Sequence, residues 1–514
     1  MENRKTKIIS IVAIVALALT VVTATYAYFQ AQTGEGSQTD IKINANTVDT
    51  FTFATGSQIS FNINQENFAS GTGNQSGSTF ASALLTANNK TNTATEHYYL
   101  YLNIESNTFT YSINESTPEI IMTVTDSSGN EVTNISTLNH VIVTGANETQ
   151  VSGYDITNKN GLITLFNNRE ITTTSSKEEK WNIKVTFVNY DQNQKANAGK
   201  SMSAKVMIQK GKIPLLADYV KSLYTGNQGD NGIYYHDSTL TNGAGDNSYR
   251  YAGANPNNYV CFGSNGSPCP TDNLYRIIGV FGDQVKLIKY DYANSNLLGT
   301  DGDYSTKTFS KSDYSTYKGE LTTINRYSWN YKNNTSINNG YGSNEWNTSL
   351  FNKINLNTNY LNKIGTTWSS LIEDTTWKVS GHTTNVVTPK AMYTAEITNA
   401  TKTYGPSNGT SKIGLMYVSD YGFAASPSAW TSNLNSYDSS TITSVNWMYM
   451  GLDEWTITPN SSNSNYVFGA SSNGYLFSSI ANRGYSGRPV LYLKASVPYA
   501  GGSGTKNSPI TLVV

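Results

Sequence analysis

The chain has 514 residues, with 35 Lys and Arg against 36 Asp and Glu, so its formal net charge at pH 7 is -1. This balance excludes the basic excess with which proteins bind a nucleic-acid backbone, and we expect no nucleic-acid partner. Hydrophobic residues make up 38% of the chain, which excludes wholesale disorder. Charged residues make up only 14%, against about 25% in an average soluble protein. Neutral polar residues must therefore supply most of the surface, as in β-rich extracellular domains.

The N-terminus carries a targeting segment. Basic residues among the first seven positions precede an uncharged stretch whose core, 8–22, is almost entirely Ile, Val, Ala and Leu. As a helix, Ile8–Phe29 would be about 33 Å long, enough to cross a bilayer. Residues 1–29 therefore predict either a signal peptide or a membrane anchor. The small residue Ala27 favours cleavage before Tyr28.

The sequence that follows this segment resembles a known group of leaders. Residues 24–44, "ATYAYFQAQTGEGSQTDIKIN", are similar to the leaders of TasA-like and camelysin-like proteins of Gram-positive bacteria. The resemblance implies an exported protein whose leader is processed by a SipW-type signal peptidase and precedes a β-sandwich. It also implies an extracellular, cell-surface or membrane-anchored location.

Residues 30–211 predict an all-β sandwich that serves as a stalk or assembly module. Short alternating or apolar runs are separated by Gly, Asn, Ser and Thr, as expected for strands joined by turns. Such runs are found at His97–Ser106, Glu119–Ile135, His140–Gly145 and Lys180–Asp191.

Residues 212–514 predict a second, α+β domain displayed at the surface. The change of pattern comes at Ile213–Tyr224, where apolar residues recur at helical spacing. The run Leu274–Asp291 predicts a β-hairpin with its turn at Gly282-Asp283. Ser419 is the predicted N-cap of a short helix over Val418–Ser426.

Long motifs in this second domain resemble an uncharacterised C-terminal domain that is widespread in secreted proteins of gut Firmicutes. The motifs are "YVCFGSNGSPCPTDNLYRIIGVFGDQVKLIKYDY", "IGLMYVSDYGFAASPSAW" and "DEWTITPNSSNS" with "RPVLYLKASV". The ending also loosely resembles C-type-lectin-like folds, which hold adhesins and phage receptor-binding domains. That resemblance implies a binding role, although a fold by itself does not fix function.

Cys261 and Cys269 are the two cysteines of the chain. In an exported protein, a pair at this spacing predicts a disulfide. A zinc site would need about four ligands, and the nearest histidine in the sequence is His236.

The loop Gly299–Thr306 places Asp301 and Asp303 two residues apart. Oxygen-rich loops of this kind suit calcium, so these are the candidate metal ligands, with a solvated loop as the alternative. We expect no other cofactor. No motif of a catalytic site occurs, and Asp420 and Glu454 would act as a glycosidase pair only if they faced each other across a cleft.

Exposed aromatic residues are the remaining candidates for ligand contact. Tyr and Trp stack on sugars and anchor protein interfaces because they combine a large apolar area with a polar group. Trp430 and Trp447 are our first candidates, with core packing as the alternative.

The sequence thus favours adhesion or recognition of a ligand through the second domain, the partner being a host or bacterial surface glycan or protein. The alternative is a structural subunit of an extracellular fibre or matrix, which the TasA-like leader implies, and a secreted hydrolase is the least favoured. The signal peptidase is a partner in maturation, and the membrane is a partner if the leader is not cut.

Overall fold

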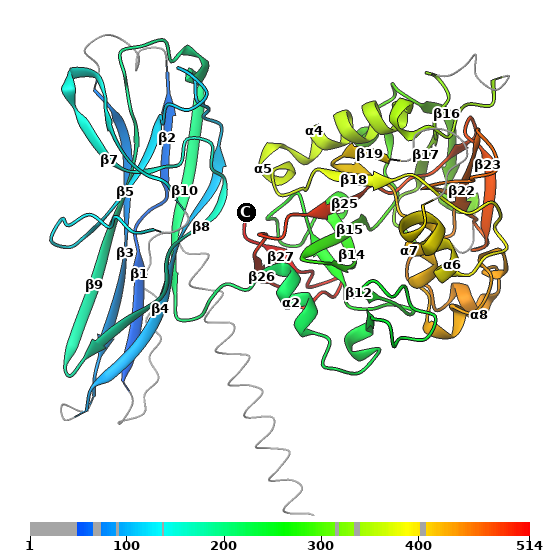
Figure 1. The fold of residues 1–514 in the computed structure, drawn as a ribbon, viewed down its shortest axis with the longest axis horizontal. Helices are drawn as coiled ribbons and strands as arrows, with labels where there is room; N and C mark the ends of the chain where they lie inside the picture. Colours follow the sequence, from blue (N-terminus) through cyan, green and yellow to red (C-terminus); the bar gives the residue numbers. More distant parts are fainter. Residues whose placement is uncertain are drawn as a thin grey trace, which may run out of the picture. The chain divides into compact units, whose positions relative to one another are not determined.

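The computed structural model describes residues 49–64, 73–88, 92–135, 138–313, 318–333, 340–400 and 408–514 (Figure 1). The leader predicted at residues 1–29 lies outside these ranges. Within them, no helix is both long enough and apolar enough to cross a membrane. The structure is mostly β, with 40% strand and 17% helix, and the paired strands of its sheets run antiparallel.

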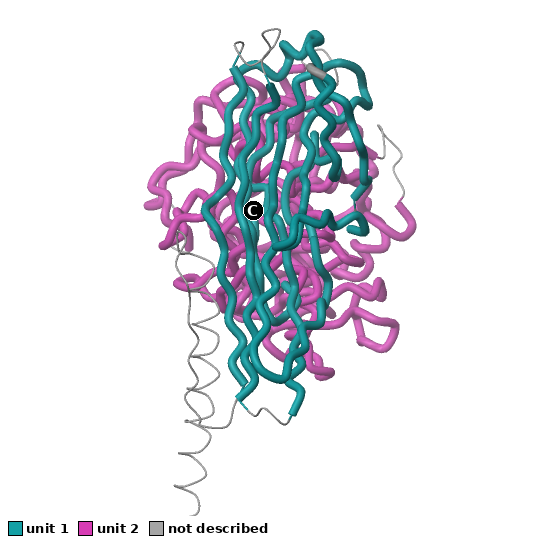
Figure 2. The backbone as a smooth tube through the Cα atoms, turned by 90° about the vertical axis from the view of Figure 1, so that its left-hand side faces the viewer, with its two compact units in different colours: residues 1–213, 513–514 teal, residues 214–512 magenta. Residues whose placement is uncertain are grey.

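The chain forms two compact units (Figure 2). Unit 1 is Met1–Ile213 with Val513–Val514, and unit 2 is Pro214–Leu512. The sequence placed the change of pattern at Ile213, next to this division. The last two residues belong to unit 1, where the buried side chain of Asn103 donates a hydrogen bond to the carbonyl oxygen of Val514 (2.6 Å).

Unit 1 contains two antiparallel sheets. One has six strands in the order β1-β3-β9-β5-β7-β6, and the other has four in the order β2-β10-β4-β8. The strands are β1 (Thr50–Thr55), β2 (Ile59–Ile63), β3 (Gln75–Thr86), β4 (Ala94–Asn107), β5 (Ile120–Asp126), β6 (His140–Thr144), β7 (Gln150–Asp155), β8 (Gly161–Thr173), β9 (Ser176–Phe187) and β10 (Lys200–Gln209), with short 3-10 turns η2 (Ala146–Glu148) and η3 (Lys195–Asn197).

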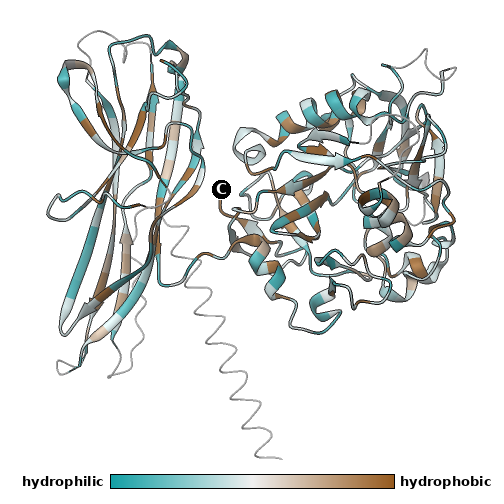
Figure 3. Cartoon of the chain, viewed as in Figure 1, coloured by the Kyte–Doolittle hydropathy of each residue, from teal (hydrophilic) through white to brown (hydrophobic). Residues whose placement is uncertain are grey.

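One apolar core joins these two sheets in a sandwich-like arrangement. Alternate residues of β9, such as Ile183 and Val185, are buried together with Leu100 and Leu102 of β4. The alternation follows from the two-residue period of a strand, which sends successive side chains to opposite faces. Figure 3 shows the resulting mixture of hydrophobic and hydrophilic residues along the strands of unit 1.

Unit 2 mixes strands with short helices. Its largest sheet has seven strands, in the order β11-β12-β14-β15-β25-β20 with β13 paired to β14. The strands are β11 (Ile233–His236), β12 (Ser248–Tyr251), β13 (Tyr259–Cys261), β14 (Leu274–Phe281), β15 (Gln284–Lys289), β16 (Tyr304–Ser310), β17 (Thr323–Ser328), β18 (Thr375–Lys378), β19 (Asn408–Ser411), β20 (Ile413–Gly414), β21 (Glu454–Pro459), β22 (Tyr466–Ala470), β23 (Leu476–Ile480), β24 (Gly484–Tyr485), β25 (Val490–Leu493), β26 (Tyr499–Gly501) and β27 (Thr511–Leu512).

The helices of unit 2 are short. The longest helical segment is the π-helical η9 (Phe351–Tyr360), followed directly by α4 (Leu361–Ile364). The others are α2 (Leu216–Ser222), α3 (Ser295–Leu298), α5 (Thr366–Ser369), α6 (Pro389–Tyr393), η10 (Thr394–Thr398), α7 (Val418–Phe423) and α8 (Ser440–Thr443), with single turns η4 (Asp230–Gly232), η5 (Thr271–Asn273), η6 (Lys311–Asp313), η8 (Trp346–Thr348), η11 (Pro427–Ala429) and η12 (Leu434–Ser436).

Several local predictions are confirmed. Strands β14 and β15 form the expected antiparallel hairpin, and Gly282 adopts the positive φ (62°) that its tight turn requires. The helix expected at 213–224 is α2. The prediction of Ser419 as an N-cap is wrong, because α7 begins at Val418 and its N-cap is Tyr417, two residues earlier; the backbone N–H of Tyr417 donates to the Asp420 carboxylate (2.9 Å).

Cys261 and Cys269 form a disulfide, as the sequence predicts. The bridge closes the loop between the end of β13 and the 3-10 turn before β14. Cys269 packs against a small apolar cluster made by Tyr259, Leu274 and Tyr290. The disulfide therefore ties an irregular loop to the edge of the seven-stranded sheet.

We expect the double substitution of Cys261 and Cys269 by serine to lower the free energy of unfolding by about 2–3 kcal/mol, because a cross-link over so short a loop removes that much entropy from the unfolded chain. Urea denaturation followed by tryptophan fluorescence measures this loss. Peptide mapping without reductant should recover the two cysteine peptides joined, and two alkylatable thiols in the native protein would contradict the pairing.

Candidate functional site

A surface basin in unit 2 is a candidate binding site. Its volume is about 230 Å³, and it lies where β23 and β24 meet the start of β21. Three serines, three aromatic residues and one carboxylate line it: Ser471, Ser478, Ser479, Tyr475, Phe477, Tyr485 and Asp453. The three aromatic residues are half-buried.

A tight turn between β22 and β23 places Tyr475 in this basin. The backbone N–H of Ser471 donates to the carbonyl of Tyr475 (2.8 Å), and that of Gly474 donates to the carbonyl of Ser471 (2.8 Å). Gly474 has a φ of 100°, and a Cβ there would lie 2.7 Å from the carbonyl oxygen of Tyr437. A residue with a side chain would be strained at this position, so the glycine is required for the turn.

Two of the rings are held firmly by their neighbours. Tyr485 packs edge-on against Trp455 (centroids 4.6 Å apart) and against Phe477 (5.0 Å). Its hydroxyl lies 3.2 Å from the hydroxyl of Ser479. These contacts fix the ring positions before any ligand arrives, which reduces the entropy lost on binding.

Asp453 supplies the charge of the basin. One of its carboxylate oxygens accepts the backbone N–H of Ser472 (2.8 Å), while its main-chain carbonyl accepts the hydroxyl of Ser486 (2.6 Å). The carboxylate is thereby oriented just before the start of β21 and keeps further lone pairs for a ligand. No histidine, lysine or arginine lines the basin. The lining therefore suits hydrogen bonding, and it lacks the serine-histidine pairing of a hydrolase.

A buried ion pair lies directly behind the basin. Arg488 and Glu454 are 2% exposed each, and the guanidinium holds the carboxylate with two hydrogen bonds, from Nε (2.8 Å) and from the second nitrogen (2.9 Å). Arg488 also donates to the carbonyl of Met448 (2.7 Å). Burial raises the pKa of Glu454, and Arg488 opposes that shift.

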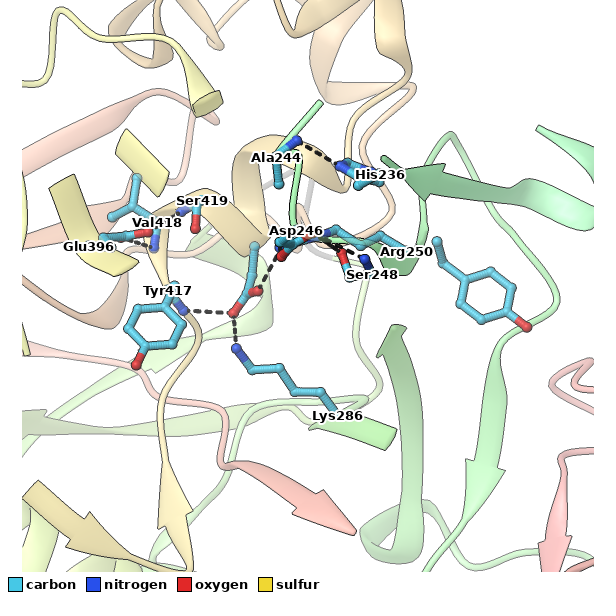
Figure 4. A network of polar contacts seen from close by, with 12 residues as sticks. His236, Ala244, Asp246, Ser248, Arg250, Lys286, Glu396, Tyr417, Val418 and Ser419 are labelled. Atoms are coloured by element: carbon cyan, nitrogen blue, oxygen red, sulfur yellow. Dashed lines mark hydrogen bonds and ion pairs between the residues drawn. The ribbon is translucent and has the colours of Figure 1, made fainter. Parts of the chain in front are cut away.

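A second buried charge cluster lies around Asp420 (Figure 4). Lys286 Nζ lies 2.5 Å from one Asp420 oxygen, and Arg250 approaches the other at 3.7 Å. Arg250 also pairs with Asp246 (2.6 Å) and donates to the hydroxyl of Ser248 (2.8 Å). Burial by itself would raise the pKa of Asp246, but the charge of Arg250 and the hydrogen bonds to the carboxylate outweigh it, and the pKa falls to about 2.

Asp420 and Glu454 do not form a glycosidase pair. Each carboxylate is buried and neutralised by its own cation, Lys286 for the first and Arg488 for the second. A glycosidase needs two carboxyl groups that flank the scissile bond in an open cleft. Their role is to hold strands and helices together inside unit 2.

Glu396 is a further buried acid, in the π-helical turn η10. Its carboxylate accepts the backbone N–H groups of Val418 (2.9 Å) and Ser419 (3.2 Å), and the hydroxyl of Thr458. It is fully buried, and this desolvation raises its pKa to about 7. The group is therefore poised to titrate near neutral pH.

The expectation that Trp430 and Trp447 contact a ligand is wrong. The two side chains are 1% and 3% exposed. Trp430 packs against His236 and Phe423 and donates its indole N–H to the carbonyl of Ala425 (2.9 Å). Trp447 donates to the carbonyl of Tyr251 (2.9 Å).

The ring of Trp447 also covers a buried cation. It lies over the guanidinium of Arg276, 4.6 Å from its centroid, and Tyr259 covers the same cation at 4.4 Å. Burial lowers the pKa of Arg276 to about 10. Both indoles are thus core residues, and the polar sequence around them reflects a core rich in buried hydrogen bonds.

Asp301 and Asp303 do not converge on a cation site. Asp303 is fully buried, and its carboxylate accepts the backbone N–H groups of Tyr331 (3.2 Å), Lys332 (2.8 Å) and Phe351 (3.2 Å). Asp301 accepts the side-chain amide of Asn359 (2.6 Å). Over the described ranges, no cluster of three or more His, Cys, Asp or Glu side chains is placed to hold a metal ion.

Comparisons with known proteins give no relative for this chain. No family model matches it, and neither curated proteins nor solved structures give a significant match.

Sequence reasoning missed the residues of the basin. Asp453, Tyr475 and Tyr485 are distant in sequence or embedded in ordinary strand patterns. The available signal was the run Tyr475–Ser479, "YLFSS", in which aromatic residues and serines stand together next to a glycine turn.

We expect Trp430→Ala to lower the free energy of unfolding by about 3–5 kcal/mol, as for other large aromatic residues removed from a core. Thermal and urea denaturation measure the loss. Tyr466→Ala is the matched control, because this tyrosine is 36% exposed and should change stability by less than about 1 kcal/mol. Equal stability of the two variants would show that Trp430 is not a core residue.

Glu396 should make unit 2 less stable as the pH rises. The folded state holds its proton up to a pKa of about 7, against an ordinary value of 4.5, so stability from this group is complete below pH 4.5 and is lost as the pH passes 7. The loss should be about 3 kcal/mol, at 1.36 kcal/mol per pKa unit. Denaturation between pH 4 and 8 measures it.

Glu396→Gln should flatten this pH dependence, because the amide cannot ionise. Glu373→Gln, at a half-buried glutamate of the same unit, is the control and should leave the slope as in the wild type. A wild-type stability that is flat or rises between pH 4.5 and 7, with no change in Glu396→Gln, would contradict the assignment.

Proposed function

We propose that this chain is an exported surface protein of a Gram-positive-type bacterium that recognises a glycan through unit 2, with the basin around Asp453 as the sugar-binding subsite. The observation that carries the proposal is the lining of the basin: half-buried aromatic rings, serine hydroxyls and one oriented carboxylate in a single concave surface.

A sugar ring matches this lining chemically. One face of a pyranose presents C–H groups that pack on an aromatic ring, and its edges present hydroxyls that donate to a carboxylate or exchange hydrogen bonds with serines. Small-molecule sites generally combine such apolar walls with a few fixed polar groups. Tyr475 offers the stacking surface, and Asp453 offers the acceptor.

The charge of the lining narrows the class of glycan. Asp453 is the charged side chain of the basin, and no cation accompanies it. A carboxylated sugar would meet a like charge without a compensating partner, whereas a neutral or amino sugar would not. We therefore propose neutral or amino sugars as the ligands.

Recognition fits the basin better than hydrolysis does. Glycoside hydrolysis uses a pair of carboxylates in most families, and the basin has only Asp453. The neighbouring Glu454 is bound to Arg488 behind the wall of the basin.

The location of the protein is part of the same proposal. The basic, apolar segment 1–29 and the TasA-like and camelysin-like sequence at 24–44 support export, with a signal peptidase as the maturation partner or the membrane as the anchor. The disulfide suits an oxidising compartment. On this proposal, unit 1 is a β-sandwich stalk and unit 2 an α+β, C-type-lectin-like recognition domain.

A structural fibre or matrix subunit is the second candidate function. The leader supports it, and so do β1 and β6, the edge strands of the six-stranded sheet, which contain no Lys, Arg, Asp or Glu that would discourage pairing with another chain.

We expect Tyr475→Ala to weaken binding of a neutral glycan by roughly thirtyfold in Kd, which corresponds to about 2 kcal/mol for a central aromatic contact. A glycan array probed with the full chain selects the ligand, and calorimetry measures Kd. Asp453→Asn should also weaken binding, and should reduce discrimination against carboxylated sugars.

Tyr466→Ala is the control for this experiment, because Tyr466 lies on β22 of the same sheet and does not line the basin. Its Kd should equal that of the wild type. Failure of the full chain to bind any neutral or amino sugar, or binding that Tyr475→Ala leaves unchanged, would contradict the proposal.

A further inference from the structure

The six-stranded sheet of unit 1 has two unprotected edges. Its outermost strands are β1 and β6, and neither has a second neighbour among the described residues. β1 reads TFTFAT and β6 reads HVIVT, so neither contains Lys, Arg, Asp, Glu or Pro. Monomeric sheet proteins usually place such residues on their edges to prevent pairing with another chain.

Other strands of unit 1 do contain charged residues. The interior strand β9 reads SKEEKWNIKVTF, and the edge strand β8 of the four-stranded sheet contains Arg169 and Glu170. The edge strands β1 and β6 of the six-stranded sheet thus lack the charged residues that the edge strand β8 of the four-stranded sheet carries, and they are less protected against pairing with another chain.

The direction of the strands makes these two edges complementary. Every neighbouring pair in the six-stranded sheet is antiparallel. Because the number of strands is even, β1 and β6 run in opposite directions. A second copy in the same orientation, shifted sideways, would therefore place its β1 antiparallel to β6 of the first and continue the ladder.

The hydrogen-bond pattern shows which backbone groups are available on β6. The N–H of Gly145 donates to Thr149 (2.8 Å), and that of Asp155 donates to Asn139 (3.1 Å). Antiparallel ladders alternate between residues that face the partner strand and residues that face away. His140, Ile142 and Thr144 therefore direct their N–H and C=O groups outward.

The same reasoning applies to β1. The N–H of Gly56 donates to the carbonyl of Phe80 (2.8 Å), and the register of β1 on β3 continues that pattern along the strand. Phe51, Phe53 and Thr55 therefore direct their backbone groups outward. Each edge offers three residues, so the two edges match in length.

The side chains on these edges also match. Met122 of the core is paired with Tyr154, and Tyr154 is paired with His140, so these three side chains lie on the inner face of the sheet. Ile142 follows His140 by two residues and therefore lies on the same inner face. Ile142 is nevertheless 66% exposed, the most exposed large hydrophobic residue described. Phe51 and Phe53 pack on the core from the same inner face. Pairing would bring Ile142 beside a phenylalanine ring.

We infer that unit 1 associates with a second copy of this chain through β6 of one copy and β1 of the next. The two surfaces are different, so the contact leaves a free β6 and a free β1 at the two ends and generates an open row of copies. Ile142 and Phe53 lie at the middle of the paired segments.

The test compares Ile142→Lys with the wild type as full chains in a mild detergent, because residues 8–29 are apolar. Light scattering after size-exclusion chromatography and negative-stain microscopy report association. The wild type should form concentration-dependent oligomers or rows. Ile142→Lys should raise the concentration for half-association at least tenfold, because a lysine on the edge blocks pairing.

Leu84→Lys is the matched control, since Leu84 is exposed (38%) on β3, an interior strand of the same sheet, and it should associate as the wild type does. Thr144→Pro is an independent variant. It removes the outward N–H of residue 144, which makes no hydrogen bond to β7, and it should weaken association as well. A monomeric wild type at high concentration, or association that the edge variants leave unchanged, would overturn the inference. All variants keep the leader, so the leader cannot cause a difference between them.

Discussion

The ion pair between Arg488 and Glu454 holds the candidate site in place. A buried charge is tolerated only when a partner compensates its lost hydration, and removing one partner of such a pair costs about 3–5 kcal/mol. Here the pair joins the start of β21 to the segment just before β25. Asp453 precedes Glu454 directly, and Tyr485 lies three residues before Arg488. The two sides of the basin are thus fixed by a contact that lies behind its wall.

Other buried charges of unit 2 are compensated in the same way. The chain has few charged residues, and several of those in unit 2 are internal: Asp420 binds Lys286, and aromatic rings surround both Lys286 and Arg250. A ring face stabilises a buried cation electrostatically. Many of the Tyr and Trp residues therefore belong to the core, and three half-buried aromatic residues line the basin.

The two proposed contact surfaces differ in physical character. In unit 2 the concave candidate site is lined by side chains from strands β23 and β24, from the turn between β22 and β23, and from Asp453 just before β21. In unit 1 the proposed contact surface is the backbone of two sheet edges, β1 and β6, for which the described part of the chain provides no second partner strand. The proposed glycan site on unit 2 and the proposed pairing edges on unit 1 are compatible, because they use separate residues.

The sequence by itself determined the local features. Strand periodicity, the hairpin at Gly282, the helix after Ile213 and the pairing of Cys261 with Cys269 all depend on residues close together in the chain. Only the tertiary structure decided which aromatic residues are exposed. Trp430 stands in polar sequence yet is buried, and Trp447 is buried as well, because their neighbours in space include rings and cations from other segments. Burial depends on packing among such segments, and local composition does not encode it.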